Sequence, residues 1–499
     1  MSALSAPPPA STDPNYAARW IILAIVGVAQ LMVVLDATIV NIALPSAQAD
    51  LGFSDDNRQW VITAYALAFG SLLLIGGRLG DLFGRKQMFV VGLFGFAVAS
   101  AIGGAANNFE LLVTARALQG AFGALLAPGA LAILATTFTD PAERGKAFGI
   151  FGALAGVGAG VGLLLGGVLT QWLSWRWCLY VNLAFAIPAA IGALITVHAH
   201  HRDRSAGGHS RSIDIPGTIT GTLGLFVLVF GFSSAETRGW DSGLTVASLI
   251  AGPLLLVAFI LIEARVSEPL LPLRIVWNAT RGGAYFSIAV LGVTMFGIFL
   301  FLTYFFQQNL GYSPIRAGLA FMPMTVTIMI IAGVASGVLL PKFGPRILVV
   351  GGLLLVSIGV GSMALIDTGS TFVHVLPGLV LIGLGAGLLY TTTFATATVG
   401  IDERDTGVAS AMLNTAQQIG GSVGTALLST LFASAVTSYA TDNPGPRVAE
   451  AASINGFTTV FWWAAGITLV GAIVSFFMMR SSSADLAASG RAPAGVGAH

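Results

Sequence analysis

Residues 20–44 read WIILAIVGVAQLMVVLDATIVNIAL, an apolar stretch whose one charged side chain is Asp36. A helix needs roughly 20 apolar residues to cross about 30 Å of hydrocarbon, so this stretch is long enough to span a membrane. Further apolar stretches of similar length follow along the chain. The sequence therefore predicts an all-α polytopic membrane protein with fourteen transmembrane helices, at 20–44, 60–79, 88–106, 110–136, 147–169, 177–197, 215–235, 243–263, 283–306, 316–340, 347–366, 372–396, 409–436 and 456–479.

The composition agrees with a surface that faces lipid. The 499 residues are 55% hydrophobic and 9% charged, with a mean hydropathy of +0.85, whereas soluble proteins carry roughly 25% charged residues. An ordinary soluble enzyme is therefore excluded. The net charge of +1 and the lack of a basic stripe argue against nucleic acid as a partner. The lone cysteine, Cys178, leaves no disulfide framework and no cysteine metal cluster.

The distribution of positive charge sets the orientation. With the N-terminus inside, 17 of the 23 Lys and Arg residues fall on the cytoplasmic side and Arg116 lies within a span. The five that fall outside are Arg58, Arg176, Arg238, Arg316 and Arg447. Cytoplasmic loops of membrane proteins carry an excess of Lys and Arg. We therefore expect a multi-pass protein of a bacterial-type plasma membrane, with both termini in the cytoplasm.

An internal repeat divides the chain. Residues 77–86 (GRLGDLFGRK) match 337–346 (GVLLPKFGPR), and Glu143-Arg144 matches Glu403-Arg404 at the same offset of 260 residues. Transporters are commonly built from such repeats, with the substrate site near the midplane where the halves meet. The predicted organisation is a disordered N-terminus (1–19), a six-helix bundle (20–197), a linker (198–214), an inserted helix pair (215–263), a linker (264–282), a second six-helix bundle (283–479) and a cytoplasmic tail (480–499).

Asp36 is the one carboxyl group deep inside a predicted span. A charge at the bilayer centre costs at least ~2.5–3.5 kcal/mol, so such a residue faces the protein interior and usually marks a pathway. Burial disfavours its ionised form, which lets it take up and release a proton. Two interpretations stay open: Asp36 couples proton movement to transport, or it is a structural carboxylate tied to the backbone or to Arg116.

Arg116 lies in the fourth span with Gln119 and Gly120 at i+3 and i+4, so the three share one helix face. Either Arg116 tunes or relays the protonation of Asp36, or it is a structural clamp between helices. Both interpretations require Arg116 to face the interior of the bundle, because lipid would not tolerate it.

Three motifs resemble one family. Residues 77–86 carry Gly-x-Leu-Gly-Asp-x-x-Gly-Arg-Lys, which resembles the Gly-x-Leu-Ala-Asp-x-x-Gly-Arg-Lys signature of the major facilitator superfamily. Residues 35–45 (LDATIVNIALP) resemble the first-span motif of its fourteen-span drug:proton antiporter branch, which includes multidrug and quaternary-ammonium exporters. Residues 116–123, with Arg-x-x-Gln-Gly-x-x-Gly, resemble the fourth-span motif. The resemblance covers residues 20–480.

The resemblance implies a major facilitator fold of two six-helix bundles plus two inserted central helices. It also implies proton-coupling roles for Asp36 and Arg116. In the family, the loop between the second and third spans latches the cytoplasmic ends of helices in the outward-open state. The corresponding residues here are Gly77, Asp81, Gly84, Arg85 and Lys86.

Glycines in the fifth span follow the spacing of the family's antiporter motif, although Leu163 stands where that motif has proline. Residues three or four apart share a helix face, so such glycines let a neighbouring backbone approach closely. Generic helix packing is the other interpretation. Leu163 should remove the kink that a proline introduces. The glycines are Gly149, Gly158, Gly162, Gly166 and Gly167.

Polar and aromatic groups within the apolar spans are candidates to line a substrate cavity. The spans hold no metal-ligand spacing and no nucleophile beside a base, so we expect no enzyme activity, no cofactor and no metal. The histidines between 198 and 209 lie among arginines in a Gly/Ser-rich linker, which is more typical of a solvated cytoplasmic loop. The cavity candidates are Gln30, Asn41, Gln119, Tyr304, Tyr390, Asn414 and Gln417.

Taken together, these features predict a monomeric, proton-coupled secondary transporter that exports drugs or other small amphiphiles by alternating access. A lone acidic group suits lipophilic cations, and neutral amphiphiles fit as well. The alternative is export or import of one specific metabolite, such as an endogenous antibiotic or a lipid, on the same fold. A membrane enzyme or receptor is disfavoured, since no sizeable extramembrane domain is present.

Overall fold

The computed structural model describes residues 14–54, 57–138, 140–198, 214–266, 269–398, 406–445 and 448–480. These ranges contain helices and no strands, as expected where lipid offers the backbone no hydrogen-bond partner. Eleven of the described helices are long and apolar enough to cross a membrane. The prediction of an all-helical membrane fold is confirmed, while the number of fourteen crossings stays a prediction.

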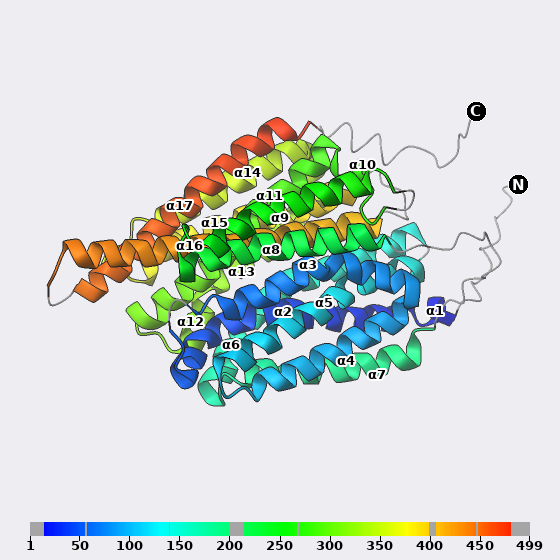
Figure 1. The fold of residues 1–499 in the computed structure, drawn as a ribbon. Coiled ribbons are helices and arrows are strands. Elements are labelled where there is room, and N and C mark those ends of the chain that lie inside the picture. Colours follow the sequence, from blue (N-terminus) through cyan, green and yellow to red (C-terminus); the bar gives the residue numbers. More distant parts are fainter. Residues whose placement is uncertain are drawn as a thin grey trace, which may run out of the picture.

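The first half of the chain forms a bundle of six long helices, in blue through cyan to blue-green in Figure 1. The helix α2 packs against α6 and α7, and α5 packs against both α3 and α4. A short helix, α1 (Pro14–Ala17), precedes the bundle. The six helices are α2 (Arg19–Leu51), α3 (Trp60–Phe83), α4 (Arg85–Gly104), α5 (Phe109–Thr137), α6 (Pro141–Trp172) and α7 (Trp177–Thr196).

The second bundle contains two interruptions. A π-helical turn, η2, ends its first helix, and the second helix is divided by a bend and by a second π-helical turn, η3. A four-residue helix, α10 (Leu273–Val276), precedes it. Its elements are α11 (Ala279–Tyr304), η2 (Phe305–Asn309), α12 (Pro314–Ala320), α13 (Met322–Val334), η3 (Ala335–Leu339), α14 (Leu340–Met363), α15 (Phe372–Thr398), α16 (Thr406–Asp442) and α17 (Val448–Met478).

The two bundles share one packing pattern. In the first, α2 contacts α6 and α7, α5 contacts α3 and α4, and α4 contacts α7. In the second, α11 contacts α16 and α17, α15 contacts α13 and α14, and α14 contacts α17. The corresponding helices therefore occupy corresponding places in each half, which is the arrangement that a duplicated six-helix unit would produce.

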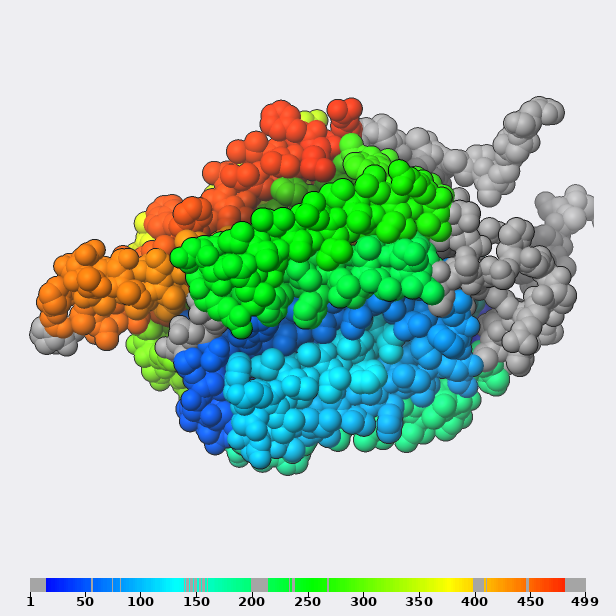
Figure 2. Space-filling view, in the orientation of Figure 1, coloured from blue at the N-terminus to red at the C-terminus, as the bar shows by residue number. Residues whose placement is uncertain are grey.

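Two helices outside the bundles, α8 (Ile215–Arg238) and α9 (Gly243–Glu263), form an antiparallel pair. The helix α8 packs against α3 of the first half and against α16 of the second. In Figure 2 the pair forms the green surface that lies across the junction of the two halves. We call the end of the molecule that carries α1 the terminal end, and the opposite end the distal end (Figure 1).

Some element boundaries differ from the predicted ones. The helix α3 continues through Gly77 to Phe83, so the chain turns at Gly84 alone, whose φ of 101° favours glycine. At Gly344 (φ 76°) the chain leaves helical geometry inside α14, which separates the predicted spans at 316–340 and 347–366. The helix α6 runs unbroken through Leu163, in line with the missing proline.

Some predicted features lie outside the described residues. They are most of the N-terminus and of the linker after 198, the pair Glu403-Arg404, and nearly all of the tail after 480. The side chain of Asp81 and the surroundings of Gly149 are likewise not described.

Candidate functional site

Asp36 lies at the centre of a buried polar cluster inside the first bundle. Its carboxylate is fully buried and accepts three hydrogen bonds. Arg116 donates from Nη1 over 2.6 Å, Gln119 from Nε2 over 2.9 Å, and Asn182 from Nδ2 over 2.6 Å. These donors come from α5 and α7, so the carboxylate on α2 joins three helices of one half.

Arg116 faces this interior and is only 1% exposed. Besides Asp36, its guanidinium donates to the Val61 carbonyl over 3.1 Å and to Gln119 Oε1 over 2.9 Å. It also lies 4.5 Å from the ring centre of Tyr65, within the range of a cation–π contact. The arginine therefore keeps two neutral acceptors and an aromatic face in addition to its countercharge.

The cluster extends to α4 through Ser100, whose hydroxyl accepts from Gln119 over 2.8 Å and from Asn182 over 3.3 Å. Within this cluster, Asn182 Oδ1 and the Tyr65 hydroxyl are buried and have no hydrogen-bond partner among the described residues. Buried polar groups are normally satisfied. An unused acceptor next to a carboxylate is the feature that a site needs in order to accommodate an added proton.

The two halves are joined at the distal end by specific contacts. The Tyr304 hydroxyl donates to Gln48 Oε1 over 2.7 Å, and Gln307 Nε2 donates to the Ile42 carbonyl over 3.0 Å. The guanidinium of Arg58 lies 4.2 Å from the ring centre of Tyr304. These contacts link α2 and the segment before α3 to α11 and η2, so they hold the halves together at this end.

The glycines of α6 divide between two neighbours. A methyl group on Gly158, Gly162 or Gly166 would meet α2, at distances of 3.1, 2.1 and 2.8 Å from its nearest atoms. On Gly167 it would instead lie 2.7 Å from the Cα of Ile315, at the start of α12 in the other half. The helix α6 therefore uses glycine both for packing within its own bundle and for the distal contact between the halves.

The other cavity candidates do not gather around Asp36. Gln417 Nε2 donates to the Tyr390 hydroxyl over 3.0 Å, which links α16 to α15, and Asn414 is half-buried nearby on α16. Gln30 is half-buried on α2, while Asn41 is buried and donates to carbonyls of its own helix. Polar groups that are partly exposed within apolar helices suit a passage between the halves.

The predicted gate residues lie at the terminal end. Arg85 and Lys86 begin α4 and donate to carbonyl groups of α5 and α7, over 3.4 and 2.9 Å. Gly77 lies within α3, where a methyl group would contact α5 at 3.6 Å. These contacts stay within the first bundle.

Several residues that belong to this arrangement were not predicted as site residues. Ser100 and Tyr65 were not expected in the cluster, and Arg58 was expected outside the membrane core, although it is only 5% exposed. A polar residue in an apolar span was the available signal for Ser100 and Tyr65. Among the described residues, no group of three or more His, Cys, Asp or Glu could hold a metal ion.

This architecture, two helical bundles with the same packing pattern and an ion pair buried inside the first of them, is that of a polytopic membrane transporter. The profile of the Major Facilitator Superfamily matches residues 26–425. The chain belongs to this superfamily, and it is a transporter rather than an enzyme.

Several curated relatives cover most of the chain. The puromycin resistance protein pur8 of Streptomyces alboniger is 45% identical over 94% of this chain and 93% of its own length. The cephamycin export protein CmcT of Amycolatopsis lactamdurans is 37% identical, covering 81% of this chain and 83% of the relative. The MFS-type transporter EfpA of Mycobacterium tuberculosis is 34% identical, covering 91% and 85%.

Solved structures share the fold at low sequence identity. An auto-inhibited peptide transporter of the POT family aligns with a TM-score of 0.68 and 14% identity, over 92% of this chain and 96% of that one. A bacterial homologue of the lysosomal transporter Spinster aligns with a TM-score of 0.62 and 14% identity, over 94% and 97%.

Proposed function

We propose that this protein is a proton-coupled exporter of drugs or other small amphiphilic compounds that works by alternating access. The observation that carries the coupling is Asp36, a fully buried carboxylate held by three donors from α5 and α7. The names of the relatives, which refer to antibiotic resistance and export, support the direction and the class of substrate.

Protonation of Asp36 would weaken the link between three helices. A neutral carboxyl group loses the charge-assisted bonds to Arg116, Gln119 and Asn182, which are roughly twice as strong as neutral ones. Arg116 would keep the Val61 carbonyl and Gln119 Oε1 as acceptors, so the protonated state does not strand the guanidinium without partners. The cluster can thus exist in two protonation states with different packing between α2, α5 and α7.

Asn182 supplies an acceptor for the added proton. Its amide nitrogen faces Asp36 in the ionised arrangement, and its Oδ1 has no partner. Rotation of the amide by half a turn would present Oδ1 to a carboxyl O–H. The inward movement of one proton contributes ~2.3 kcal/mol per 100 mV and ~1.4 kcal/mol per pH unit. That energy would drive the exchange of proton for substrate.

The test is export driven by a pH gradient in proteoliposomes, with Asp36→Asn as the variant and Asp50→Asn as its matched control. Both substitutions remove one carboxylate from the same helix. Asp50, however, pairs with Arg176 and Trp175 near the surface at the distal end. We expect Asp36→Asn to abolish gradient-driven export of a dye such as ethidium, and Asp50→Asn to retain it. Full gradient-driven export by Asp36→Asn would refute the coupling.

A second measurement separates coupling from misfolding. Counterflow exchange of labelled for unlabelled substrate needs the conformational cycle but no net proton movement. Asp36→Asn should keep counterflow, because asparagine resembles the protonated carboxyl group in size and charge. Loss of counterflow together with a normal elution profile in size exclusion would assign Asp36 the structural role instead.

Export of one specific metabolite is the second candidate, favoured by the relatives whose names each refer to a single antibiotic. The two candidates differ in substrate range. Accumulation of a panel of dyes and antibiotics, in cells with and without the protein and with an uncoupler control, distinguishes them.

The proposed placement is a monomer in a bacterial plasma membrane, with fourteen crossings and both termini in the cytoplasm. The excess of Lys and Arg on one side supports this orientation. Single cysteines introduced at Ser54 and Gly369, on a Cys178→Ser background, should react with an impermeant thiol reagent from outside intact cells. A cysteine at Gln87 should not react.

A further inference from the structure

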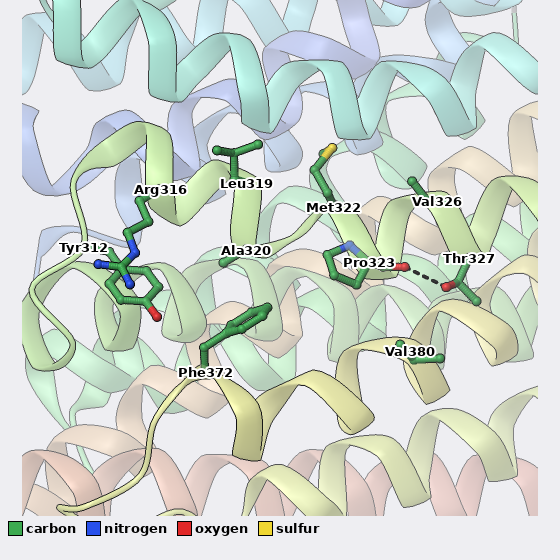
Figure 3. Close-up of a pocket in the computed structure, with 10 residues that line it drawn as sticks. All are labelled: Tyr312, Arg316, Leu319, Ala320, Met322, Pro323, Val326, Thr327, Phe372 and Val380. Atoms are coloured by element: carbon green, nitrogen blue, oxygen red, sulfur yellow. Dashed lines mark hydrogen bonds between the residues drawn. The ribbon is translucent and has the colours of Figure 1, made fainter.

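A groove of about 600 Å³ lies on the surface of the second half, between α12–α13 and α15 (Figure 3). The chain bends at Phe321, where α12 ends and α13 begins with Pro323 in its first turn. A proline in that position supplies no backbone N–H and favours such a bend. Apolar side chains such as Leu319, Val326 and Val380 line the groove.

The groove opens away from the protein interior. Leu319 and Val326 lie two turns apart on one face of the bent helix and are 52% and 49% exposed. On the opposite faces, Met324 and Thr325 are buried against α15 and α6. In a membrane protein, a surface that is both apolar and exposed contacts the hydrocarbon. The lining therefore extends along α12–α13 over a length of roughly 10 Å, the rise of seven helical residues.

One cation stands at the distal mouth of this groove. Arg316 is exposed, and its guanidinium lies 3.9 Å from the ring centre of Tyr312. None of the described carboxylates pairs with it; the ion pairs that the structure gives involve other arginines. Arginine and tyrosine at the end of an apolar surface are typical of the level of the lipid headgroups.

We propose that this groove binds an anionic phospholipid of the outer leaflet, with one acyl chain between α12–α13 and α15 and the phosphate on Arg316. The inference rests on the topology proposed above, which puts the distal end outside. An elongated apolar groove that is open to hydrocarbon matches an acyl chain. A guanidinium at its mouth that none of the described carboxylates offsets selects a headgroup with net negative charge over a zwitterionic one.

The test is native mass spectrometry of delipidated protein, titrated with dioleoyl phosphatidylglycerol or dioleoyl phosphatidylcholine. Wild-type protein should bind one phosphatidylglycerol more tightly than phosphatidylcholine. Arg316→Gln should weaken phosphatidylglycerol binding about fivefold, the change that corresponds to ~1 kcal/mol for one cation near the membrane surface. Phosphatidylcholine binding should weaken less, because the choline cation offsets the charge of its phosphate. Arg238→Gln removes an exposed arginine from the distal end of α8 and is the matched control, with no change expected.

A second variant tests the acyl-chain half of the proposal. Val380→Trp fills the groove without changing the charge and should lower the occupancy of both lipids. Equal binding of the two lipids by wild-type protein, or tight phosphatidylglycerol binding by Arg316→Gln, would overturn the proposal. So would displacement of the lipid by an exported dye, because the groove would then belong to the substrate route. These measurements need no transport, so their failure leaves the proposed export function intact.

Discussion

Replacement of Gly167 by alanine should hold the two halves apart at the distal end. The new methyl group would lie 2.7 Å from both the Cα of Ile315 and the carbonyl oxygen of Pro314, atoms of the α12 backbone. An ordinary contact is 3.4 Å or longer, so α12 has to move by about 0.7 Å. Overpacking of this kind costs ~1–3 kcal/mol. The equilibrium between the arrangement in this structure, in which the halves touch at the distal end, and one in which they are apart would shift about 5- to 150-fold toward the latter.

The assay measures the distance between spin labels on cysteines at Asn107 and Gly369, in exposed loops of the two halves at the distal end. The background is Cys178→Ser, because Cys178 is the one native cysteine. In Gly167→Ala the distance distribution should move toward longer distances than in wild-type protein.

Gly166→Ala is the matched control. Its methyl group would clash equally, at 2.8 Å from the Ile39 carbonyl oxygen, but both helices belong to the first half. It should lower thermal stability and leave the distance between the labels unchanged. An unchanged distribution in Gly167→Ala, or equal separation in Gly166→Ala, would show that the distal contact does not control closure.

Three further predictions concern charged groups. Arg116→Gln leaves the Asp36 carboxylate buried without a countercharge and should lower the free energy of unfolding by about 3–5 kcal/mol, measured by thermal unfolding. The double variant Arg116→Gln/Asp36→Asn should regain most of that stability. Additive losses from the two substitutions would contradict the prediction. Arg58→Gln removes the cation above the Tyr304 ring and should destabilise the closed distal end by up to ~2 kcal/mol. The same spin-label distances should then shift toward longer values. A hydrogen bond from the Ser370 hydroxyl lowers the pKa of Asp367, so Ser370→Ala should be less stable than wild-type protein at neutral pH. That difference should become smaller as the pH falls through the lowered pKa, until only the loss of the bond that the Ser370 hydroxyl accepts from the Asp367 N–H is left. A pH-independent difference would argue against the carboxylate.

The sequence predicted the helices well because lipid imposes a simple rule on length and hydrophobicity. It also indicated that Asp36 and Arg116 face the protein interior, since a charge within an apolar span is costly in lipid. The contacts of Ser100 and Tyr65 with these residues depend on how each helix is rotated about its axis, and the weak amphipathicity of spans that are apolar on every side leaves that rotation open. The contacts that join five helices in this cluster could therefore not be predicted from the sequence of each span alone.

Arg58 shows a second limit. Hydropathy assigned it to an outer loop, because it precedes the apolar run of α3. In the structure it is buried against aromatic rings of the other half, where its charge is offset by the faces of Tyr304 and Phe432. A contact between distant segments cannot be read from local composition. Local composition also underestimated two helices at the distal end. The helix α16 extends to Asp442, beyond the predicted end at 436, and α17 begins at Val448, before the predicted start at 456.

The helix pair α8–α9 makes the two flanks of the molecule unequal. Since α8 contacts both α3 and α16, it covers one of the two seams along which the halves meet. The other seam, between α6 and α12–α13, has no such cover among the described helices. If the halves rock against each other, the uncovered seam between α6 and α12–α13 would open to the lipid, while α8–α9 would keep the other seam covered. A lipophilic molecule that diffuses within the bilayer would then reach the interior from one side of the protein.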